Sequence, residues 1–95
     1  MKTDIHVLLS GGHKVRKAFL TEIQHQVAES VPAMEPQISY TTKMLCGNKF
    51  WVILNNRERR LVGRCLAHLV IHRLLPLQFV GPTRKYPKKY ALREQ

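Results

Sequence analysis

The sequence predicts a small α+β domain in which about three helices precede a C-terminal β-hairpin. Three observations favour this class. The chain has 95 residues, apolar residues recur at helical spacing over most of its length, and two short alternating segments follow Pro76. A chain of this length has room for one hydrophobic core, so residues 1–95 are expected to form a single domain.

The first predicted helix spans residues 13–30. Its apolar residues recur at spacings of three and four, with charged and polar residues between them, as in Val15, Phe19, Leu20, Ile23 and Val27. Before this helix, residues 5–9 are apolar but few, so both a short strand and a helical turn stopped by Gly11 and Gly12 stay open.

The second predicted helix spans residues 41–54, where threonines at the start offer N-cap oxygens. Bulky apolar residues lie on nearly every side of it: Leu45, Phe50, Trp51, Ile53 and Leu54. We therefore expect this helix to be largely buried, with Phe50 and Trp51 in the core rather than exposed for stacking. This helix can divide in two at Gly47 and Asn48.

The third predicted helix spans residues 56–73. Asn55 and Glu58 have the spacing of a capping box at its start, and Pro76 is expected to end it. At ~100° per residue, one face is apolar and consists of Val62, Cys65, Leu66 and Leu69. The opposite face carries Arg57, Arg60, Arg64 and His68. One side of this helix is expected to pack, and the other to present charge.

After this helix, the sequence pattern predicts a β-hairpin over residues 77–92. Its two strands alternate in polarity, with Leu77 and Phe79 facing the core on one and Tyr90 and Leu92 on the other. The residues between the strands include a glycine, two prolines and two adjacent cations, which is typical of a stiff basic hairpin tip.

Positive charge dominates the composition and is concentrated toward the C-terminus. The chain has 16 Lys and Arg against 6 Asp and Glu, for a net charge of +10. From Arg57 onward there are ten basic and two acidic residues, a net charge of +8. A surplus of this size favours an anionic partner, first of all nucleic acid.

Other function classes find little support in the residues. No apolar stretch approaches the ~20 residues that cross a bilayer, and no secretory signal precedes Ile5, so we expect a cytoplasmic protein without a membrane partner. No catalytic motif or useful pair of carboxylates is present, so we expect neither an enzyme nor a bound cofactor. A weaker alternative is a structural zinc ion, whose four ligands would be Cys46, Cys65, His68 and His72.

The order of these segments resembles the winged helix-turn-helix family of DNA-binding proteins. The resemblance rests on architecture: the motif would comprise residues 41–54, a turn at Asn55 and Asn56, and the helix that begins at Arg57, with residues 77–92 as the wing. It implies that the helix after the turn lies in the major groove and that the wing touches the backbone or the adjacent minor groove. Because that helix is longer than usual, crossing the backbone is the alternative.

The candidate nucleic-acid-binding residues follow from this charge pattern. They are the polar face of the third helix and the basic and aromatic residues of the wing: Arg57, Arg60, Arg64, His68, Arg84, Lys85, Tyr86, Lys88 and Lys89. Arginine can bind guanine with two hydrogen bonds, whereas lysine acts as a point charge on phosphate. We therefore expect the helix arginines to give specificity and the wing lysines to give affinity.

The leading hypothesis is a duplex DNA-binding protein, either a small transcriptional regulator or an accessory factor of a mobile element. The segment before His13 is expected to be free for homodimer formation. Two alternatives remain open: an adaptor or inhibitor that presents its basic face to an acidic protein, and an RNA-binding accessory protein.

Overall fold

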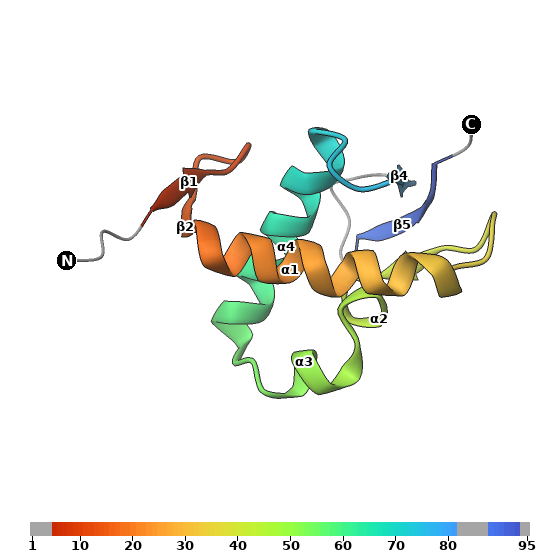
Figure 1. Ribbon diagram of the computed structural model, residues 1–95, viewed down its shortest axis with the longest axis horizontal. Coiled ribbons are helices and arrows are strands. Elements are labelled where there is room, and N and C mark those ends of the chain that lie inside the picture. Colours follow the sequence, from red (N-terminus) through yellow and green to blue (C-terminus); the bar gives the residue numbers. More distant parts are fainter. Residues whose placement is uncertain (1–4, 82–87, 94–95) are drawn as a thin grey trace.

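The computed structural model describes residues 5–81 and 88–93, and these form an α+β fold with two small antiparallel sheets (Figure 1). In chain order the elements are β1 (His6–Leu8), β2 (Lys14–Arg16), α1 (Lys17–Ser30), a 3₁₀ turn (Val31–Ala33), β3 (Tyr40–Thr41), α2 (Thr42–Cys46), α3 (Asn48–Val52), α4 (Asn56–Ile71), β4 (Leu77–Val80) and β5 (Lys89–Leu92). Figure 1 shows the β1–β2 hairpin at one end of the long axis and β4 and β5 toward the other.

The centre of the core is the apolar face of α4. Val62, Cys65, Leu66 and Leu69 are fully buried, as their spacing predicts. Helix α1 crosses α4 (Figure 1) and contributes the equally buried Ile23 and Val27. Because one face of α4 is covered in this way, its opposite face is left toward solvent.

The predicted hairpin is the main part of a three-stranded sheet. Strand β5 lies in the middle, antiparallel to β4 on one side and to β3 on the other. Tyr90 pairs with both Phe79 and Tyr40, and its ring centroid lies 5.3 Å from that of Phe79. Leu77 and Tyr90 are fully buried, whereas Phe79 and Leu92 are partly buried against the core. Strand β3 was not predicted, since two residues are too few to show an alternating pattern.

The predicted capping box is confirmed at the start of α4. The Glu58 amide donates to Oδ1 of Asn55 at 2.8 Å, and the Asn55 amide donates to Oε1 of Glu58 at 2.9 Å. These two hydrogen bonds give a partner to two backbone amides at the helix start that have none within the helix. The cap fixes where α4 begins and hence which residues of its sequence face the core.

The end of α4 differs from the prediction of residues 56–73. The helix ends at Ile71, where the Leu74 amide donates to the Leu69 carbonyl at 2.9 Å and the Arg73 amide donates to the Val70 carbonyl at 3.1 Å. This is a Schellman motif, with Arg73 in the left-handed region at φ 56°. Local hydrogen bonds therefore end the helix before Pro76 is reached.

The start of the first helix is corrected. The helix predicted over residues 13–30 begins only at Lys17, because residues 14–16 pair with residues 6–8 as a hairpin. Of the two alternatives left open for residues 5–9, the strand is observed, over His6–Leu8, and Gly11 and Gly12 lie in the hairpin turn rather than at a helix end.

The helix predicted over residues 41–54 is divided into α2 and α3 at Gly47, whose φ of 87° suits glycine. Leu45 and Leu54 are buried as expected, but Ile53 is 76% exposed because it follows the end of α3. Phe50 and Trp51 are only partly buried.

None of the helices in the described residues combines the length and the apolar character needed to cross a bilayer. The tip of the predicted wing, residues 82–87, lies outside the described part of the chain.

The capping box predicts a measurable contribution to stability. Replacing Asn55 by Ala leaves the Glu58 amide without its partner, so we expect the free energy of unfolding to fall by about 1 kcal/mol. Urea denaturation followed by circular dichroism measures this difference. Asn56→Ala, one residue into the helix, is the matched control and should change stability much less; equal losses in the two variants would contradict the role of the cap.

Candidate nucleic-acid interface

A groove of about 680 Å³ runs between α2, α3, α4 and the start of β5. Its lining is Thr41, Thr42, Lys43, Trp51, Arg59, Arg60, Gly63, Arg64 and Lys88. The lining surface is mostly apolar, as the Trp51 ring and the long stems of Lys and Arg side chains can provide. Among the described residues that line the groove, five of nine are Lys or Arg and none is acidic.

The groove brings together part of the predicted site. Arg60 and Arg64 of α4 line it together with Lys88, which immediately precedes β5. The helix arginines and the base of the hairpin therefore share one concave surface. Arg57 and Lys89 are exposed but do not line this groove.

Three predicted residues, Arg84, Lys85 and Tyr86, lie outside the described residues, and their part in the site stays a prediction.

Sequence reasoning missed several lining residues. Lys43 lies in a helix that was expected to be buried, and Arg59 lies about 20° from Leu66 on the helical wheel, at the edge of the apolar face. Trp51 was expected in the core. The wheel position of Arg59 gives no signal that it joins the basic residues, and the place of Lys43 depends on the break at Gly47.

One wall of the groove is held in place by Arg59. Its guanidinium carbon lies 5.4 Å from the centroid of the Trp51 ring, and its Nε donates to the Trp51 carbonyl at 3.3 Å. The attraction between a guanidinium group and an aromatic face adds to this hydrogen bond. Trp51 and Arg59 therefore join α3 to α4 with little freedom for either side chain.

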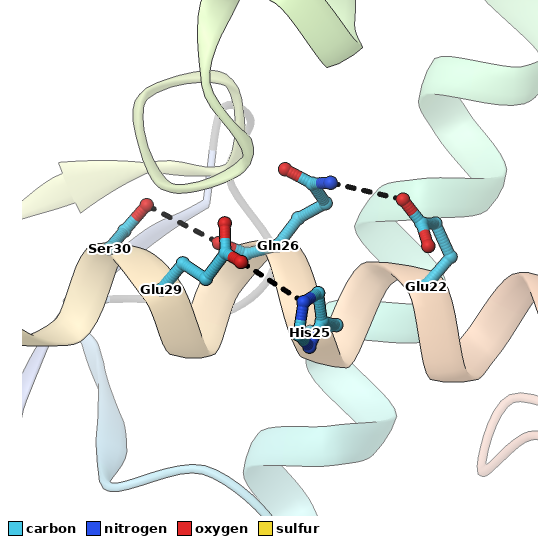
Figure 2. A network of polar contacts seen from close by, with 5 residues as sticks. All are labelled: Glu22, His25, Gln26, Glu29 and Ser30. Carbon is cyan, nitrogen blue, oxygen red and sulfur yellow. Dashed lines mark hydrogen bonds and ion pairs between the residues drawn. The ribbon is translucent and has the colours of Figure 1, made fainter.

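Three of the acidic side chains with described positions have other roles. Glu22 and Glu29 lie on the exposed side of α1, where Glu22 accepts from Gln26 at 3.0 Å and Glu29 lies 3.0 Å from Nε2 of His25 (Figure 2). Glu58 belongs to the capping box. Within residues 5–81 and 88–93, no carboxylate pairs with Arg60 or Arg64. The charges of these two arginines are thus left uncompensated by the described acids.

The N-terminal hairpin docks beside this face of α4. Nη1 of Arg64 donates to Nδ1 of His13 at 3.3 Å, so the residue that precedes β2 helps to position this arginine. The segment before His13 was expected to be free for dimer formation, but Ser10 in it contacts α4 of the same chain. Ile5 and Leu8 nevertheless remain largely exposed on it.

A second contact fastens the hairpin turn to the end of α4. The Ser10 amide donates to Nδ1 of His68 at 3.0 Å, and the Ser10 hydroxyl lies 3.1 Å from the same nitrogen and 3.2 Å from Nε2 of His72. Because Nδ1 accepts from an amide, neutral His68 carries its proton on Nε2. His68, a predicted nucleic-acid residue, is therefore engaged in holding the hairpin and does not line the groove.

The pKa of His68 is lowered by partial burial and, to a smaller extent, by the neighbouring His72. The two imidazole rings lie 4.3 Å apart between centroids. Protonation would also place a hydrogen on Nδ1, facing the Ser10 amide, so it would break the hydrogen bond that docks the turn.

The structure does not assemble the alternative zinc site. Among the described residues, no three His, Cys, Asp or Glu side chains are grouped so as to hold a metal ion. Cys46 and Cys65 are buried in the core, where burial raises the pKa of each thiol to about 12; the charge of Cys46 adds to the effect on Cys65. Both thiols are therefore protonated at neutral pH.

Comparisons with family models, curated proteins and solved structures give no significant match.

The Ser10 contact predicts a loss of stability in mild acid. The folded-state pKa of His68 is depressed, so the unfolded chain takes up a proton first as the pH falls through about 6.5. The contribution of the contact is present above that pH and is lost as the pH falls through the lower folded-state value. Urea denaturation between pH 7.5 and 5 measures it.

His68→Gln should remove this part of the pH dependence, whereas His25→Gln, on the exposed side of α1, should retain it. The interpretation fails if wild type and His68→Gln lose the same stability over this range.

Proposed function

We propose that this chain is a small winged helix-turn-helix protein that binds duplex DNA, as a transcriptional regulator or as an accessory factor of a mobile element. The order of α2, α3, α4 and the β4–β5 hairpin supports the fold proposal, as does the central position of β5 between β3 and β4. In this arrangement α4 is the helix after the turn and the hairpin is the wing.

One observation carries the binding proposal: cations from three separate segments line one groove. Lys43 comes from α2, Arg59, Arg60 and Arg64 from α4, and Lys88 from the start of the wing strand. Bringing like charges together costs free energy in the absence of a counter-charge, and none of the described residues that line the groove is acidic. A polyanion removes this cost when it binds.

Duplex DNA is the polyanion that fits best. It carries about one negative charge per 1.7 Å of axis, and proteins that neutralise its phosphates gain affinity from released counterions. The cations of α4 and of the wing are spread over neighbouring elements, so they form a surface rather than a single small anion site. A surface of this kind supports binding to an extended charged rod.

Removing cations from this surface should weaken DNA binding in a way that depends on salt. We expect Arg60→Ala to weaken binding to duplex DNA of any sequence and to reduce the slope of log K against log salt by about 1, and the double change Lys88→Ala with Lys89→Ala to reduce that slope by about 2. Fluorescence anisotropy with a random-sequence duplex at several salt concentrations measures both.

Lys17→Ala is the matched control, because Lys17 is exposed at the start of α1 and does not line the groove. It removes one charge and should change the affinity much less. Absence of duplex binding at low salt would refute the proposal; co-purification with one acidic polypeptide would then favour the adaptor alternative. Preference for a hairpin RNA over a duplex of equal length would favour the RNA alternative.

A further inference from the structure

Gly63 stands in the middle of α4, and nothing in the described fold requires a glycine there. Glycine is a poor helix former because it loses the most backbone freedom on folding. Its φ is not in the left-handed region, and a Cβ built on it meets no atom of the described residues within 4 Å. Neither backbone conformation nor close packing against this described part of the chain therefore explains it.

The position of Gly63 in the groove offers the explanation. It lines the groove with Arg60 and Arg64, which lie three residues before it and one residue after it. On a helix, residues three and four apart are neighbours, so Gly63 is flanked by Arg60 and Arg59, and Arg64 lies about 100° from it on the far side of Arg60. The missing side chain leaves the helix backbone open beside these guanidinium groups, as glycine does where a ligand must approach the main chain closely.

We propose that the groove over Gly63 seats the sugar–phosphate backbone of one DNA strand, with the sugars against its apolar lining and the phosphates against its cations. This inference rests on the proposed function and adds the part of the DNA that contacts this segment of α4. It assigns Gly63 as the point of closest approach.

The shape of the groove favours the backbone over the edges of the bases. Side chains read base edges by projecting from a convex helix into the major groove, whereas the surface around Gly63 is hollow and walled by Trp51 and Arg59. A hollow surface receives the convex edge of a strand. Its mostly apolar lining suits the carbon-bound hydrogens of the sugars, and its cations suit the flanking phosphates.

The two arginines can contact different phosphates of one strand. Arg60 and Arg64 are separated by about 6 Å along the helix axis, and the phosphates of a strand follow one another as closely spaced single charges. Contacts of this kind position the protein on DNA without reading its sequence.

The test separates the stability of the fold from its affinity for DNA. Gly63→Ala should raise the melting temperature by up to about 8 °C, since alanine favours the helix and meets no neighbour. The same variant should weaken binding to a random-sequence duplex. Gly63→Gln, which adds a larger uncharged side chain, should weaken it about 5- to 150-fold, the range expected when extra atoms crowd a packed contact.

Thr21→Ala is the control, because it improves helix propensity at an exposed position of α1 that does not line the groove. It should leave DNA affinity unchanged. Melting curves and fluorescence anisotropy at one fixed salt concentration provide the two readouts for all variants.

Each other outcome overturns the inference in a distinguishable way. If wild type binds duplex DNA and both Gly63 variants bind equally well, the strand does not pass over Gly63, while the proposed function stands. If Gly63→Ala melts at a lower temperature, the glycine has a role within the fold. If wild type binds no duplex, both proposals fail; binding of polyglutamate that Gly63→Gln weakens would then assign the groove to an acidic protein.

Discussion

Burial of one face of α4 is the constraint on which the rest of this structure depends. Val62, Cys65, Leu66 and Leu69 are fully excluded from water, and each such side chain stabilises the fold by about 1.5–3 kcal/mol relative to exposure. Rotating α4 about its axis would expose these residues and bury guanidinium groups. Burying an unpaired charge costs far more free energy than replacing one exposed residue by another. The outward direction of Arg60 and Arg64 is therefore a consequence of core packing.

The elements around α4 then turn its exposed side into a hollow surface. The break at Gly47 divides the segment before α4 into two short helices, and the contact between Arg59 and Trp51 holds the second of them against α4. On another side, the β4–β5 hairpin brings Lys88 to the same groove. Each of these elements contributes only some of the cations, and the positive groove exists only where the elements meet.

The N-terminal hairpin has a supporting role that connects the fold to the site. Its turn is attached to the end of α4 through Ser10, and His13 accepts a hydrogen bond from Arg64. A titratable residue, His68, holds the first of these contacts. The orientation of one groove arginine is thus linked to a contact that weakens when an imidazole takes up a proton.

Local patterns in the sequence determined the α+β class, the apolar and charged faces of α4, the capping box at Asn55 and the hairpin that follows, because each depends on neighbours within a few positions. They also determined that Arg60 and Arg64 point away from the core. Only the tertiary structure decided that Lys43, Trp51 and Arg59 line the groove with them, that β3 joins the sheet, and that His68 holds the hairpin. These features bring together residues far apart in the chain, and their meeting depends on how whole elements pack.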